Sequence, residues 1–143
     1  MRKTILSLVA ALLVAVMQGP ATAQSASATD QAAIVSVIQS QIEAFRLDDG
    51  ERAFSYASPN IRRMFRTPGR FMMMVRTGYP AVYRPRDVAF LELVPSDRGP
   101  TQFVQLVGPD GGVVIGLYYM QAQSDGTWKI NGVQLLDQGD LTT

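Results

Sequence analysis

VVIGLYYMQAQSDGTWKINGVQLL, residues 113–136, contains two runs rich in β-branched and aromatic side chains on either side of Ser124-Asp125-Gly126. Such runs favour strands, and a short turn-forming segment between them favours an antiparallel hairpin. Two further extended runs precede this hairpin, at residues 88–94 and 102–107. The connecting segments 95–100 and 108–112 are rich in Pro, Gly and Asp. The second half of the chain therefore predicts a four-stranded antiparallel meander.

The last extended run, residues 127–136, does not alternate evenly. We interpret Asn131-Gly132 as a bulge, which inserts one extra residue and returns the following side chains to the earlier face. The expected result is one buried row along this strand, made of Trp128, Ile130, Val133 and Leu135.

The first half of the chain has helical spacing. A row of apolar residues at four- and three-residue intervals predicts a first helix from about residue 30 to residue 47. Thr29 or Asp30 is its expected N-cap, and Asp48 with Glu51 resembles a capping box for a short second helix. The apolar row is Ile34, Ile38, Ile42 and Phe45.

Two more helix starts follow, at Ser58-Pro59 and Thr67-Pro68, where a hydroxyl at the N-cap precedes proline at the first helical position. These short helices are expected to bury Ile61 with Phe65, and Phe71 with Val75. Helices first and a meander afterwards predict an α+β domain, with the helices packed on one face of a curved antiparallel sheet.

The N-terminus has the pattern of a secretory signal peptide. Arg2 and Lys3 precede an apolar run over residues 5–17, and Ala21-Thr22-Ala23 provides a small-residue cleavage site. We expect residues 1–23 to be removed, 24–29 to form a disordered leader, 30–137 to form a single domain and 138–143 to form a C-terminal tail. The processed protein is then periplasmic or secreted, without a transmembrane anchor.

The chain contains neither histidine nor cysteine. The usual zinc, haem and iron–sulfur ligands are therefore missing, together with Ser-His-Asp and Cys-His nucleophile systems. We expect no metal and no cofactor. The net charge of +1 gives no general attraction to nucleic acid, and no stacking platform for bases is visible in the sequence.

Three segments resemble a known family of exported bacterial proteins, the domain of unknown function 4864. They are Gln41-Ile42-Glu43-Ala44-Phe45, the stretch from Ala53 to Pro59, and the stretch from Met74 to Pro85. The helix-then-meander order is also similar to the nuclear transport factor 2-like (cystatin-like) superfamily. That resemblance implies a cone-shaped fold with a cavity between helix and sheet, and its members include isomerases, dehydratases and non-catalytic binding modules.

One segment is strongly basic: residues 52–86 carry eight arginines and no acid. Guanidinium groups bind carboxylates and phosphates through paired hydrogen bonds, so this segment is a candidate anion site. Alternatively, the arginines cover apolar surface or pair with nearby acids such as Asp48. Two tyrosines flank the proline of the helix-to-sheet connection and border the implied cavity. The candidate ligand-binding residues are Arg62, Arg66, Arg70, Tyr79, Tyr83 and Arg84.

We interpret the protein as a non-catalytic module of the cell envelope that binds an anionic or polar small molecule or another envelope protein. One alternative is a small cavity enzyme of the isomerase or hydratase type, with Glu92 or Asp87 as base and Tyr79 or Tyr83 as acid or oxyanion donor. A second alternative is a structural module that forms a homodimer. The run Met72-Met73-Met74 is interpreted as packing, because consecutive helical residues point about 100° apart and do not converge on one metal.

Overall fold

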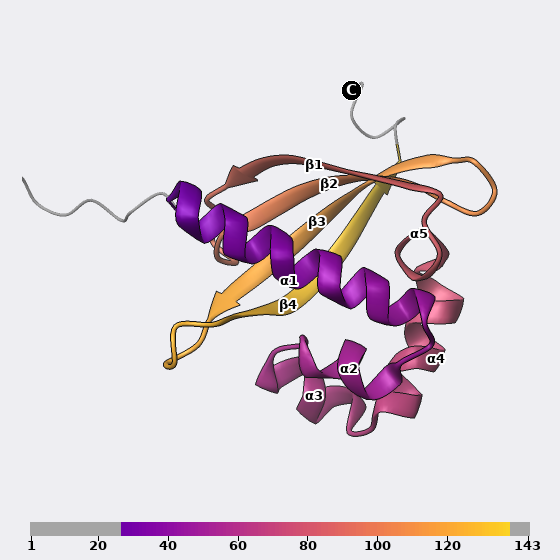
Figure 1. Ribbon diagram of the computed structural model, residues 1–143, viewed down its shortest axis with the longest axis horizontal. Coiled ribbons are helices and arrows are strands. Elements are labelled where there is room, and N and C mark those ends of the chain that lie inside the picture. Colours follow the sequence, from indigo (N-terminus) through magenta and orange to yellow (C-terminus); the bar gives the residue numbers. More distant parts are fainter. Residues whose placement is uncertain (1–26, 138–143) are drawn as a thin grey trace, which may run out of the picture.

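The computed structural model describes residues 27–137, in which five helices precede a four-stranded sheet (Figure 1). The helices are α1 (Ala28–Arg46), α2 (Gly50–Ser55), α3 (Pro59–Phe65), α4 (Pro68–Gly78) and α5 (Pro80–Tyr83). The strands are β1 (Asp87–Val94), β2 (Thr101–Val107), β3 (Val113–Ala122) and β4 (Trp128–Asp137). The α+β class is confirmed. The predicted signal peptide, residues 24–26 of the predicted leader and the predicted tail lie outside the described residues.

The sheet is an open antiparallel meander in the order β1-β2-β3-β4, as the turn-separated runs predicted. The bulge in β4 is also confirmed, because Tyr119 pairs with Gly132 while Met120 pairs with Ile130, which leaves Asn131 as the extra residue. Of the predicted row, Ile130 is buried, and the others are half-buried against the core. Those half-buried side chains are Trp128, Val133 and Leu135.

The first helix begins earlier than the sequence predicted. Ser27, and not Thr29 or Asp30, is the N-cap: its hydroxyl accepts from the backbone N of Asp30 at 3.1 Å. The Asp30 carboxylate in turn accepts from the backbone N of Ser27 at 3.0 Å. This reciprocal capping box satisfies two backbone donors, so the leader expected up to residue 29 ends before Ala28.

The second helix is capped by Asp49, and not by Asp48 as predicted. The Asp49 carboxylate accepts from the backbone N of Arg52 at 3.1 Å. Asp48 has a positive φ of 52° and directs its carboxylate toward Tyr83 and Arg84 instead. The Ser58 and Thr67 caps are confirmed, whereas the single turn α5 was not predicted.

The core lies between α1 and the facing side of the sheet. Phe45 of α1 packs against Phe71 of α4 with ring centroids 6.0 Å apart, and Phe71 packs against Phe54 of α2 at 5.3 Å. Tyr118 of β3 is fully buried, its hydroxyl has no hydrogen-bond partner, and burial raises its pKa above the usual range.

None of the helices within residues 27–137 is long and apolar enough to cross a bilayer.

The segment before α3 pairs with the edge of the sheet and thereby positions that helix. The backbone N of Ser58 donates to the carbonyl of Ile130, and the N of Ile130 donates to the carbonyl of Tyr56, each at 2.9 Å. Ala57 forms an isolated parallel bridge with Ile130. These bonds place the start of α3 beside the β4 bulge.

Candidate functional site

A cavity of about 450 Å³ lies among α1, α3, α4 and β4. Its volume is within the range of sites that hold small molecules. Most of its wall is apolar. The apolar lining side chains are Phe45, Ala57, Ile61, Met64, Phe65, Phe71, Met74, Val75, Val82, Ile130 and Val133.

Two short helices provide one wall of this cavity. On α3, Ile61 and Phe65 are four residues apart, and on α4, Phe71 and Val75 have the same spacing, which places each pair on one side of its helix. Phe71 and Val75 are buried, as predicted. Ile61 and Phe65 are only half-buried: both pack partly against the core and also line the cavity.

Asn131, the extra residue of the bulge, is held by a buried hydroxyl. The backbone N of Ile61 donates to Ser58 Oγ at 3.3 Å, and Ser58 Oγ donates to Asn131 Oδ1 at 2.7 Å. Since Oδ1 accepts from the hydroxyl, the amide Nδ2 of Asn131 is the end left for other partners. Asn131 lines the cavity, so this arrangement provides it with an oriented hydrogen-bond donor.

Arg98 comes from the β1–β2 turn and also lines the cavity. Its guanidinium carbon lies 3.8 Å from the centroid of the Tyr119 ring. Gly132 leaves room for it: a Cβ there would lie 3.4 Å from Nη2 of Arg98. The Tyr119 ring therefore supports the guanidinium by a cation–π contact, and Arg98 forms no ion pair within residues 27–137.

The remaining polar lining is uncharged. Gln41 is buried, and its Nε2 donates to the carbonyl of Ala53 at 3.1 Å. Asn60, Tyr79 and Gly132 complete the lining, and no carboxylate from the described residues belongs to it. Among the residues that the structure describes, the cavity lining therefore combines apolar side chains with hydrogen-bonding groups and one cationic residue.

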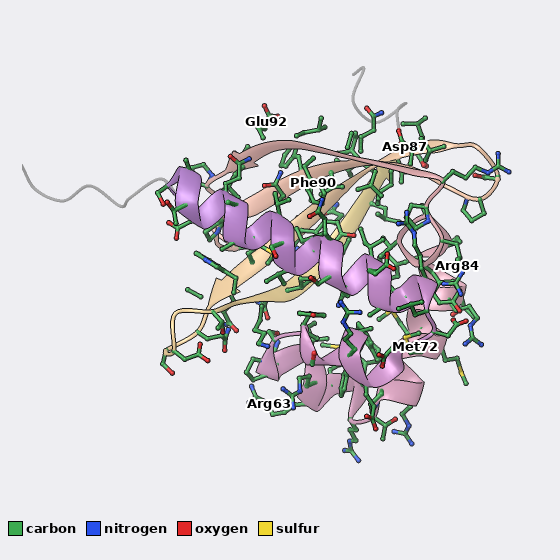
Figure 2. The ribbon with its side chains drawn as sticks, in the orientation of Figure 1. Arg63, Met72, Arg84, Asp87, Phe90 and Glu92 are labelled. Carbon is green, nitrogen blue, oxygen red and sulfur yellow. The ribbon has the colours of Figure 1, made fainter. Side chains whose placement is uncertain are left out.

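The carboxylates proposed as bases lie elsewhere (Figure 2). Asp87 and Glu92 are exposed on β1, at the opposite end of the molecule from Arg63. A register shift between Phe90 and Leu93 explains the position of Glu92, because strict alternation would place it on the helix-facing side with Phe90. Leu93 takes that side instead. The predicted pairing of Glu92 or Asp87 with Tyr79 or Tyr83 is therefore not assembled.

Tyr83 and Arg84 belong to a separate cluster that joins α5 to the end of α1. Tyr83 donates from its hydroxyl to Asp48 Oδ1, and Arg84 Nη2 donates to the same oxygen at 2.9 Å. Arg84 Nη1 also donates to the carbonyl of Phe45. The hydrogen bonds from Tyr83 and then Arg84 lower the pKa of Asp48. Arg84 thus pairs with a nearby acid, as the structural alternative predicted, and neither residue lines the cavity.

The other predicted arginines also lie away from the cavity. Arg62 and Arg66 border a shallow hollow formed with Phe54, Pro59 and Arg63, on the side of α3 opposite Ile61. Arg70 is exposed in the first turn of α4. Of the six predicted ligand-binding residues, Tyr79 alone lines the cavity.

Sequence reasoning did not identify Arg98, Asn131, Asn60 and Gln41 as site residues. The bulge at Asn131-Gly132 was a usable signal, because bulges re-aim side chains and occur near binding sites. Arg98 gave no comparable signal, since its position depends on the pairing of β2, β3 and β4.

No cluster of three or more acidic side chains within the described range is arranged to hold a metal ion. No curated protein and no solved structure matches the chain. A protein family described as a domain of unknown function (DUF4864) matches residues 27–143. The chain therefore belongs to the DUF4864 family.

Proposed function

We propose that the protein binds a small molecule with an apolar body and a carboxylate head, and that it does not transform this ligand. The observation that carries the proposal is the composition of the cavity wall. A mostly apolar surface borders a cavity of about 450 Å³, and the polar residues on its lining include Asn131 and Arg98.

The residues that line the cavity match both the apolar body and the carboxylate head of this ligand. Transfer of an alkyl chain from water to the apolar wall is favourable by about 0.8 kcal/mol per buried CH₂ group. The planar guanidinium of Arg98 can donate two hydrogen bonds to one carboxylate. The oriented Nδ2 of Asn131 can donate a third.

Proton-transfer catalysis is less well supported. A general base must reach the substrate proton, and the candidate bases Asp87 and Glu92 do not line the cavity. Tyr79 remains beside the cavity as a hydrogen-bond donor, which suits ligand binding.

We also propose that the fold is the nuclear transport factor 2-like cone and that the protein acts in the cell envelope. A cavity between the helices and one side of an antiparallel sheet supports the first proposal. The charged start, apolar run and Ala21-Thr22-Ala23 of the N-terminal sequence support export.

Export has a direct test in the mass of the processed chain. Expressed with its complete N-terminus in a Gram-negative host, the protein should appear in the periplasmic fraction with an intact mass that begins at Gln24. A full-length chain retained in the cytoplasm would contradict this proposal.

The ligand proposal is tested by calorimetric titration with decanoate and with decanamide, its uncharged analogue. Arg98→Gln should weaken decanoate binding by about 10- to 100-fold, because hydrogen bonds to a charged group contribute about 1.5–3 kcal/mol. Decanamide binding should change by no more than about threefold in the same variant. Arg86→Gln, which removes an exposed arginine outside the cavity, is the matched control.

If Arg98→Gln lost the same affinity for decanoate as for decanamide, Arg98 would not contact the head group of the ligand. If neither ligand bound the wild-type protein, this ligand class would be wrong.

A further inference from the structure

The two sides of α3 differ in chemistry. Asn60, Ile61, Met64 and Phe65 line the cavity. The opposite side bears the exposed side chains of Arg62, Arg63 and Arg66, which we call the α3 arginine surface. Because successive helical residues turn by about 100°, Arg62 and Arg63 lie opposite the cavity-lining set, and Arg66, the C-cap of this short helix, borders the same hollow.

The α3 arginine surface is not neutralised by any ion pair within the described part of the chain. None of its three arginines forms an ion pair within residues 27–137, and residues 52–86 contain no acid. Figure 2 shows Arg63 at the helical end of the molecule, far from Asp87 and Glu92. Arg70 at the start of α4 is also exposed and adds positive charge to this helical end.

The surroundings of these arginines restrict the partner. Phe54 lies beneath Arg62, whose guanidinium carbon is 5.8 Å from the ring centroid, and the ring is almost fully buried. The patch therefore has no exposed aromatic ring on which a base could stack or that could anchor a protein interface. It is a shallow, open hollow.

We propose that the α3 arginine surface docks the protein on bilayers that contain anionic phospholipid. Guanidinium groups bind phosphate oxygens through paired hydrogen bonds, and basic side chains near an anionic leaflet are attracted to its surface potential. Each such residue raises partitioning about fivefold, so three arginines together contribute about 100-fold. This contact is peripheral and does not depend on the ligand of the cavity.

Vesicle co-sedimentation tests the proposal, with phosphatidylglycerol–phosphatidylcholine vesicles compared with pure phosphatidylcholine. The wild-type protein should bind the anionic vesicles only, and binding should fall as sodium chloride is raised. The triple variant Arg62→Gln, Arg63→Gln and Arg66→Gln should lower the partition coefficient about 100-fold. The single variant Arg63→Gln, at an exposed position, should lower it about fivefold and covers the case in which the triple variant does not fold.

A second group of three arginines provides the charge-matched control. Arg46, Arg52 and Arg86 border a polar groove between α1 and β1, and replacing them by glutamine removes the same net charge. This control should retain most of the binding. If the two triple variants lost the same amount of binding to anionic vesicles, net charge alone would account for the binding. If the wild-type protein bound pure phosphatidylcholine vesicles as well as anionic ones, apolar adsorption would account for it. Displacement by inorganic phosphate, beyond the effect of chloride at equal ionic strength, would indicate a free-phosphate site; each of these results overturns the proposal.

Discussion

Phe45→Ala should lower the free energy of unfolding by about 3 to 5 kcal/mol, the range for loss of a buried phenylalanine. The Phe45 side chain is 1% exposed and connects three parts of the fold. The centroid of its ring lies 6.0 Å from that of Phe71 and 6.3 Å from that of Tyr83, and the side chain also lines the cavity. Urea denaturation followed by far-ultraviolet circular dichroism measures the change.

Met73→Ala is the matched control for this substitution. Met73 is 65% exposed on α4, so its truncation should change the free energy of unfolding by less than about 0.5 kcal/mol. A loss below about 1 kcal/mol for Phe45→Ala would contradict the packing of α1 on α4, since fully buried aromatic side chains cost more to remove.

Ile61→Trp should lower decanoate affinity by about 100-fold or more, because the indole and the alkyl chain compete for the same space. Ile61 is half-buried on the cavity side of α3, so the larger side chain can extend into the cavity. The free energy of unfolding should therefore change little. Isothermal titration calorimetry measures the affinity.

Met73→Trp adds the same indole to an exposed position outside the cavity and should leave decanoate affinity unchanged. If Ile61→Trp also bound decanoate with wild-type affinity, the ligand would occupy another part of the molecule.

Much of the fold could be predicted because it depends on local chemistry. Turn-forming segments separate the four strands, and the hydroxyl–proline pairs at Ser58 and Thr67 mark two helix starts. The bulge at Asn131 followed from a break in alternation within one strand.

Other features depend on contacts between distant segments. Asp48 does not cap α2, because Tyr83 and Arg84 from beyond α4 bind its carboxylate. Glu92 is exposed because of an irregular pairing between β1 and β2, which strand periodicity alone does not reveal.

The candidate site was harder to predict than the fold. The acid-free segment predicted that its arginines bind a ligand. In the structure, Arg62 and Arg66 face away from the cavity and Arg84 binds Asp48. Helical periodicity within residues 59–65 could have separated Arg62 from Ile61. The placement of Arg98 beside Gly132 required the sheet register, because the two residues are far apart in sequence.

In the proposed complex, the cavity among α1, α3, α4 and β4 holds an apolar ligand with its head at Arg98 and Asn131. Isotope-filtered NMR of the labelled protein with unlabelled decanoate tests it most directly, because it detects which protein protons lie beside the alkyl chain. We expect saturable contacts from the chain to the methyl groups of Ile61, Met74 and Val75, and a shift of the Asn131 side-chain amide. Contacts instead to Ile115 and Leu117, on the sheet face away from the helices, or no saturable contacts at all, would contradict the claim.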